Sequence, residues 1–314
     1  MKSMLFLNLR KSIKKCKQLT YRAVLSLFCI SATEPKHLLW LVRLALFIII
    51  FKSVLHRIIY ELKKARGRLF SPISAPYFLP SCIIRINFHG IRMKYYIRRG
   101  EEDLICVNPY LHEYDIREKL LKKIILLKLQ NEKVAFVDVG AHVGTYSIFV
   151  SLLLDGRGEV IAIEPSPYNI AHLSQNLRIN NVNNVKIINK GIMGDVGVRK
   201  LYFATGCSGN ASFIKEWNIG YSGELKTYLV NVCPLDQALS ECLGESFLKL
   251  KYVLKIDTEG LDFDVLLSGP SVLKNTIYII VESSSKEILP FLELHGFKCE
   301  KITDPVLSYI LAEK

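Results

Sequence analysis

Short apolar runs rich in β-branched residues recur through the second half of the chain and alternate with segments of helical spacing. Residues 134–139 and 159–163 are two such runs, and the apolar stretch 146–154 between them has the pattern of a helix. Continuous apolar runs are typical of parallel strands that helices cover on both faces. Further strands are predicted at 185–188, 252–256 and 277–281, so the pattern predicts an α/β fold.

Three other segments complete this pattern. Residues 82–87 and 91–97 predict a hairpin around His89-Gly90, and residues 116–129 predict a helix that leads into the first core strand. Residues 194–234 are rich in glycine, β-branched and aromatic residues and predict an antiparallel insertion beside the acceptor pocket. Its Trp217, Tyr221 and Tyr228 could stack on a sugar ring, and packing within the hairpin is the alternative role for each.

The first core strand runs into a glycine turn that predicts a nucleoside site. Gly140 and Gly144 lie between the strand and the next helix, where a ligand can approach the backbone and meet unpaired N–H groups. The next strand ends in Glu164, and an acid at that tip binds ribose hydroxyls in α/β nucleotide sites. The first strand carries Asp138 near its tip, and position 142 is His where a dinucleotide fingerprint has glycine. This combination favours the ammonium-bearing S-adenosylmethionine over the pyrophosphate of NAD.

Several motifs spread over about residues 80–300 resemble the FkbM-type methyltransferase family. The matching segments are 136–147, 164–167, Asn176-Leu177 with Asn180-Asn181, Leu235-Asp236, and 254–260, which reads LKIDTEG. Position 142 is often Asn in that family and is His here. The resemblance implies a class I, Rossmann-like core with a mostly parallel seven-stranded sheet, helices on both faces and S-adenosylmethionine as cofactor. It also implies methylation of a hydroxyl on a sugar, glycolipid or small metabolite. We expect the cofactor to be bound by these residues: Asp138, Gly140, Ala141, His142, Gly144, Tyr146, Glu164, Pro165, Gly191 and Ile192.

A second group of acids follows the later strands. Asp257 and Glu259 come directly after the strand 252–256, and Glu282 follows 277–281. Because strand carboxyl ends line the ligand crevice of open α/β sheets, these are the candidate catalytic residues. An alcohol needs a base to accept its proton. Asp257 or Glu259 is predicted to be that base or to hold the acceptor, with Glu282 and His142 as outside candidates. Alternatively, Asp257 contacts the cofactor and Glu259 caps the next helix.

Charge is distributed unevenly along the chain. Residues 1–70 (the basic arm) hold 15 Lys or Arg and two acids, whereas residues 71–314 hold 27 of each sign. The net charge of +13 therefore belongs to the arm, and the predicted enzyme, residues 71–314, has no nucleic-acid motif. This predicted enzyme is divided into a hairpin-and-helix part, residues 71–130, and a catalytic core, residues 131–314. Eight scattered cysteines without a C-x-x-C pair, and acids without His-carboxylate spacing, predict reduced thiols and no metal site.

The basic arm contains the most apolar stretch of the chain, residues 38–51. It is interrupted by Arg43 and is shorter than the roughly 20 residues that span a bilayer. We expect an arm with helices that associates with the cytoplasmic face of a membrane. A true span and a helix that packs in an oligomer are the alternatives, and the oligomeric state is left open.

Two other functional classes are compatible with these patterns. One is a nicotinamide-dependent oxidoreductase, which Asp138 and the missing middle glycine disfavour. The other is a membrane-tethered binding module that keeps the fold without catalysis. The acceptor itself, a glycan or small molecule, is not identified by any residue pattern.

Overall fold

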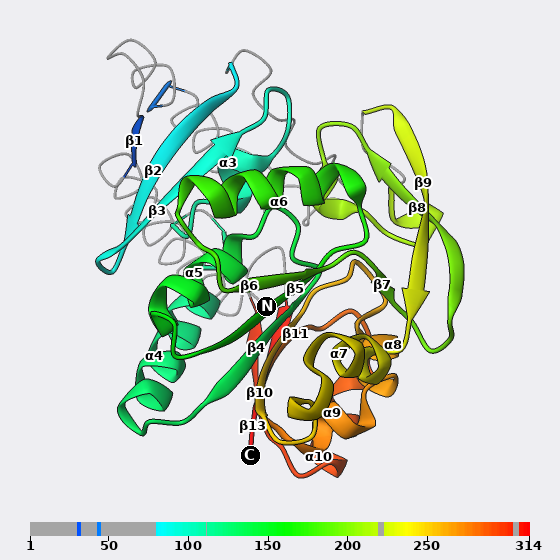
Figure 1. Ribbon diagram of the computed structural model, residues 1–314. Coiled ribbons are helices and arrows are strands. Elements are labelled where there is room, and N and C mark those ends of the chain that lie inside the picture. The colour runs from blue at the N-terminus through cyan, green and yellow to red at the C-terminus, as the bar shows by residue number, and fades with distance from the viewer. Residues whose placement is uncertain (1–29, 33–42, 45–79, 111, 219–222, 304–307) are drawn as a thin grey trace, which may run out of the picture. The chain divides into compact units, whose positions relative to one another are not determined.

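The computed structural model describes residues 30–32, 43–44, 80–110, 112–218, 223–303 and 308–314 (Figure 1). The chain forms two compact units. The first comprises residues 1–114 with 220–222, and the second comprises 115–219 with 223–314. The predicted hairpin thus belongs to the first unit, and the predicted catalytic core to the second.

The first unit contains a three-stranded antiparallel sheet in the order β1-β2-β3. Its strands are β1 (Ile30–Ala32), β2 (Cys82–Phe88) and β3 (Ile91–Ile97), followed by the short helix α3 (Asp103–Cys106). The hairpin prediction is confirmed, with His89 and Gly90 both at positive φ as a two-residue hairpin turn requires. β1 was not predicted, because three residues within a basic segment carry no strand periodicity.

The second unit is built on a seven-stranded sheet in the order β12-β13-β11-β10-β4-β5-β6. The strands from β11 to β6 pair in parallel, and β13 is antiparallel to both of its neighbours. This is the mostly parallel sheet that the sequence predicts. Its strands are β4 (Val134–Val139), β5 (Gly158–Ile163), β6 (Val185–Ile188), β10 (Lys251–Ile256), β11 (Thr276–Glu282), β12 (Lys298–Thr303) and β13 (Ser308–Glu313).

Helices cover both faces of this sheet (Figure 1). All six residues of β4 are buried and all except Asp138 are apolar, which explains why the strand reads as an apolar run. Alternate side chains point to opposite faces, and Ala135, Val137 and Val139 form one core with α7, α8, α9 and α10. Those helices are α7 (Leu235–Leu243), α8 (Asp262–Leu267), α9 (Pro270–Lys274) and α10 (Ile288–Leu294), and the others are α4 (Tyr114–Leu129), α5 (Thr145–Leu154) and α6 (Pro167–Ile179).

The insertion forms its own three-stranded sheet in the order β7-β9-β8. β8 (Gly197–Ala204) and β9 (Leu225–Cys233) are antiparallel, as predicted, and β7 (Gly191–Ile192) pairs in parallel with the end of β9. Residues 212–214, predicted as β structure, make only an isolated bridge between Ser212 and Tyr202. The 3-10 turns η1 (Ser208–Asn210) and η2 (Lys215–Asn218) flank that bridge, and η3 (Gly244–Ser246) follows α7.

The described part of the chain contains no helix that is both long and apolar enough to cross a membrane. Of the apolar stretch 38–51, only Arg43 and Leu44 are described, and both are helical. The membrane expectation therefore falls almost wholly outside the described residues and stays a prediction.

Candidate functional site

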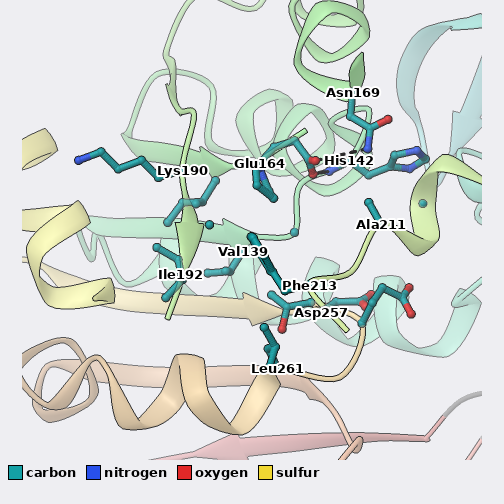
Figure 2. A pocket seen from close by; sticks show the side chains of 17 residues that line it. Val139, His142, Glu164, Asn169, Lys190, Ile192, Ala211, Phe213, Asp257 and Leu261 are labelled. Atoms are coloured by element: carbon teal, nitrogen blue, oxygen red, sulfur yellow. Dashed lines mark hydrogen bonds between the residues drawn. The ribbon is translucent and has the colours of Figure 1, made fainter. Parts of the chain in front are cut away.

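The ligand cleft lies where the strand order of the large sheet reverses. β4 has β5 on one side and β10, which comes much later in the chain, on the other. Open α/β sheets bind ligands at such a point, outside the carboxyl ends of the strands. Figure 2 shows the cleft. Its lining includes eight of the predicted site residues, Gly140, His142, Glu164, Pro165, Gly191, Ile192, Asp257 and Glu259, together with Lys190, Asn169 and Phe213. The other predicted site residues, Asp138, Ala141, Gly144, Tyr146 and Glu282, are not part of that lining.

Neighbouring protein atoms leave no room for a Cβ at either glycine of the turn after β4. Gly140 has a φ of +80°, and a Cβ there would lie 1.8 Å from the carbonyl oxygen of Asp257. At Gly144, with a φ of +87°, a Cβ would lie 2.3 Å from Cδ1 of Leu173. The expectation that both glycines serve ligand approach is therefore incomplete, because Gly140 lets the β4 and β10 turns meet and Gly144 lets α6 pack.

Glu164 is the most fully hydrogen-bonded acid of the cleft. It is 4% exposed, and its Oε2 accepts the backbone N–H of His142 at 2.8 Å. Its Oε1 accepts the backbone N–H of Ser166 at 3.0 Å. The same oxygen accepts the side-chain amide of Asn169 at 3.3 Å (Figure 2). Burial raises the pKa of Glu164, and the three N–H donors oppose that rise. A carboxylate offers about four lone-pair sites, so acceptor capacity remains for a ligand hydroxyl.

Asp138 is buried beneath the cleft at 1% exposure. Its Oδ2 accepts the Ser147 hydroxyl at 2.7 Å, and its Oδ1 lies 4.0 Å from Lys255 Nζ. Burial raises the pKa of Asp138, while Lys255 and the Ser147 hydrogen bond act in the opposite direction. The ammonium of Lys255 also lies 5.2 Å from the centre of the Tyr146 ring. Asp138 and Tyr146 therefore interact with an internal cation, a feature that the motif alone did not indicate.

Asp257 enters the cleft from the end of β10. Its Oδ2 accepts hydrogen bonds from Lys255 Nζ at 3.1 Å and from the Tyr309 hydroxyl at 3.3 Å. Lys255 is thus shared between Asp138 and Asp257, whose strands are neighbours in the sheet. Sequence reasoning missed Lys255 and Tyr309. Lys255 stands inside the quoted LKIDTEG segment, but no local signal links Tyr309, on β13, to this edge.

Glu259 connects the cleft to the insertion. It has a φ of +53°, and its Oε2 accepts the indole N–H of Trp217 at 2.5 Å. Its carbonyl oxygen accepts the Ser212 hydroxyl at 2.8 Å. The alternative that Glu259 caps the next helix is not what the structure shows, because Leu261 is the N-cap of α8.

Glu282 and Asp262 are two further acids near Asp257, of which Asp262 is buried and Glu282 partly buried. Among the described residues, Oε2 of Glu282 is buried without a hydrogen-bond partner. Burial, with Asp257, Glu259 and Asp262 nearby, raises the pKa of Glu282 to about 10. Asp262 accepts hydrogen bonds from Thr258 and Ser284, and burial raises its pKa too. A group that is protonated at neutral pH is a poor general base, so this geometry disfavours Glu282 in that role.

The insertion is bonded to the other side of the cleft through Ser208. The Ser208 hydroxyl lies 3.1 Å from His142 Nε2, and its carbonyl oxygen accepts the Asn169 side-chain amide at 3.1 Å. At Gly191, one of the expected cofactor-binding residues, a Cβ would lie 2.4 Å from Cζ of Phe213. The insertion thus supplies Phe213 directly beside Gly191. Sequence reasoning missed Phe213 and Ser208, which are contributed by an irregular segment without periodicity.

The remaining aromatic candidates are placed as follows. Tyr228 stacks on Phe203 with ring centres 5.6 Å apart, and Phe203 stacks on Tyr168 at the same spacing. Tyr228 therefore packs within the insertion, and Tyr221 lies outside the described residues. The part of the chain that the structure describes contains no group of three His, Cys, Asp or Glu side chains that could hold a metal.

A mostly parallel seven-stranded sheet with its cleft at the reversal of strand order defines a Rossmann-like methyltransferase core. The FkbM methyltransferase domain matches residues 138–299, which is just over half of the 314 residues. The chain belongs to this family, which confirms the resemblance inferred from the motifs.

Known structures with a similar fold are distant. They include an FkbM methyltransferase from Methylobacillus flagellatus, with 14% identity, a TM-score of 0.40, and coverage of 59% of this chain and 44% of that one. A precorrin-6y C5,15-methyltransferase from Geobacter metallireducens has 15% identity and a TM-score of 0.37, with coverage of 64% of this chain and 87% of that one. The N-terminal domain of human METTL16, solved with S-adenosylhomocysteine, has 13% identity and a TM-score of 0.37, covering 63% and 69%. These values carry no argument about chemistry. Comparison with curated proteins finds no match.

S-adenosylmethionine is the cofactor of this class of methyltransferase, and the cleft fits it. Glu164 offers acceptor capacity for ribose hydroxyls, and Ile192 and Phe213 provide apolar surface for a purine. Asp257 and Glu259 supply negative charge that suits a ligand with a sulfonium and an ammonium group.

Proposed function

We propose that this protein transfers a methyl group from S-adenosylmethionine to a hydroxyl of a sugar, a glycolipid or another small metabolite. The observation that supports hydroxyl methylation is the carboxylate of Asp257, which lines the cleft and is held there by Lys255 and Tyr309. The family membership supports methyl transfer over the nicotinamide-dependent alternative.

Methyl transfer to a hydroxyl requires the protein to align the donor with the acceptor and to provide a group that accepts the hydroxyl proton. When bound, S-adenosylmethionine supplies a methyl group on a sulfonium, whose sulfur is a good leaving group. The protein's task is then to hold the acceptor oxygen in line with that methyl group. As this oxygen bonds the carbon, its proton must leave, and Asp257 accepts it. Glu164 binds the ribose, and Lys255 holds the Asp257 carboxylate in the cleft through their 3.1 Å contact.

Cofactor binding tests the site first. Calorimetric titration of the full-length protein with S-adenosylhomocysteine should show binding that Glu164→Gln weakens by about 1–3 kcal/mol, roughly tenfold to a hundredfold. Glu159→Gln is the matched control, because Glu159 is on the strand that leads into Glu164 but is paired with Lys186 at 2.9 Å, with its side chain 40% exposed. Binding of NAD in preference to S-adenosylhomocysteine would contradict the assignment.

Transfer is tested second, with tritiated S-adenosylmethionine and a panel of glycans and glycolipids. At saturating cofactor, Asp257→Asn should lose about 10²–10⁴-fold in rate, because the amide cannot accept the proton. A protein that binds the cofactor, yet transfers no methyl group to any member of the panel, would instead be the non-catalytic binding module.

A further inference from the structure

Trp217 is an exposed aromatic residue bonded to a residue of the cleft. It lies on η2, in the insertion, and is 38% exposed. Its indole N–H donates to Oε2 of Glu259, and Glu259 lines the cleft two residues after Asp257. The chain thus has a large apolar ring bonded to Glu259, a carboxylate of the cleft two residues after the proposed base.

The indole is held in a fixed position. A Cβ on Gly260, whose φ is +103°, would lie 3.0 Å from Cζ3 and 3.1 Å from Cε3 of Trp217. The ring therefore occupies the space that a side chain at position 260 would need. The backbone N–H of Trp217 donates to the Ile214 carbonyl at 3.1 Å, and Ser212 bonds the Glu259 carbonyl. An aromatic surface that is ordered in advance binds a ligand with little loss of side-chain entropy.

The charges around this ring favour a neutral ligand over an anion. Asp257 and Glu259 face the cleft, with Asp262 and Glu282 behind them. Lys255 is the cation bonded to Asp257, and it is buried at 4% exposure. A phosphorylated or carboxylated acceptor would approach like charges here, which is unfavourable where screening by water is weak.

We propose that Trp217 is the acceptor platform of this enzyme: one face of a neutral sugar ring stacks on its exposed indole, and a ring hydroxyl donates to Glu259. This inference rests on the proposed function and names the acceptor class as a neutral pyranoside. A sugar ring has an apolar C–H face and polar hydroxyls at its edge, which matches an indole beside a carboxylate. The stacked ring presents another hydroxyl toward Asp257.

The sequence offers a direct reporter for this platform. The chain has two tryptophans, Trp40 and Trp217, so Trp40→Phe makes Trp217 the sole source of tryptophan fluorescence. The full-length variant, saturated with S-adenosylhomocysteine, is titrated with methyl glucoside, methyl galactoside, methyl mannoside and methyl N-acetylglucosaminide. At least one of these should change the emission saturably. Three controls accompany the titration. Glycerol has hydroxyls but no ring face, glucose 6-phosphate adds an anion to a sugar ring, and choline carries a cation.

Substitutions separate stacking from the carboxylate contact. Saturation-transfer NMR follows glycoside binding where the reporter is lost. Trp217→Ala should weaken binding of the responsive glycoside about tenfold or more. Trp217→Phe keeps an aromatic face and should lose less. Glu259→Gln tests the hydroxyl contact. Trp217→Ala and Trp217→Phe should bind S-adenosylhomocysteine with the affinity of the parent protein, because Trp217 is not part of the cleft lining.

Each other outcome overturns a different statement. Normal S-adenosylhomocysteine binding with no response to any methyl glycoside refutes the platform and leaves the proposed function standing. Tighter binding of choline would assign the indole and Glu259 to a cationic acceptor, and tighter binding of glucose 6-phosphate would refute the charge argument. Absence of S-adenosylhomocysteine binding in the parent protein refutes the proposed function itself.

Discussion

Alanine in place of Gly140 should disrupt the contact that joins the two halves of the cleft. The new Cβ would lie 1.8 Å from the Asp257 carbonyl oxygen and 3.0 Å from its carbon. Those are backbone atoms at the end of β10, so they cannot rotate away as the end of a side chain can. The β4 and β10 turns must separate, and that movement displaces the Asp257 carboxylate.

Substitutions at two other glycines show whether the loss of stability comes from the contact with Asp257 or from the left-handed backbone alone. Gly156 has a φ of +77° and no atom within 4 Å of an added Cβ, so Gly156→Ala meets only the left-handed backbone penalty of about 1–2 kcal/mol. Gly140→Ala adds an over-packing penalty of about 1–3 kcal/mol and should lose about 2–5 kcal/mol in total. Gly144→Ala should fall between them, because its neighbour is the flexible end of Leu173.

Urea unfolding of the full-length protein measures the free energy of unfolding of each variant. At an unchanged m-value, the shift of the unfolding midpoint gives the loss of stability. Total stabilities of about 5–15 kcal/mol leave room for the ranking to be resolved. Equal losses for Gly140→Ala and Gly156→Ala would mean that the Asp257 carbonyl does not approach Gly140. The inference that Gly140 lets the β4 and β10 turns meet would then be refuted.

Two further predictions concern the acids behind the cleft and the insertion. The pKa of Glu282 is raised to about 10 in the folded protein. Above about pH 4.5, Glu282 is therefore ionised in the unfolded chain but still protonated in the folded one, and the free energy of unfolding falls by up to about 1.4 kcal/mol per pH unit. Glu282→Gln should therefore gain stability relative to the parent between about pH 5 and pH 9 in urea unfolding, and parallel pH profiles would contradict this. Gly191→Ala meets Phe213 at 2.4 Å and should weaken S-adenosylhomocysteine binding by about 1–2 kcal/mol. The added substitution Phe213→Leu should recover part of that loss, and strict additivity of the two would show that the side chains at positions 191 and 213 are not in contact.

The sequence alone determined the α/β class, the strand–turn–helix unit and the acids at the strand tips. The residues of β4 other than Asp138 are apolar because both faces of that strand are buried, and this leaves an apolar run that is visible without any structure. The placement of Gly140, Glu164 and Asp257 at one sheet edge also follows from local pattern, because the carboxyl ends of parallel strands meet there.

The tertiary structure decided which partner each site residue has. Asp138 and Asp257 share Lys255 because β4 and β10 are neighbours, and Tyr309 reaches Asp257 from β13. The sequence could not show that Gly140 accommodates a backbone carbonyl, that Phe213 lies against Gly191, or that Trp217 bonds Glu259. These contacts join segments far apart in the chain. Their identity depends on strand order and on the path of an irregular insertion, and neither property is encoded in local periodicity.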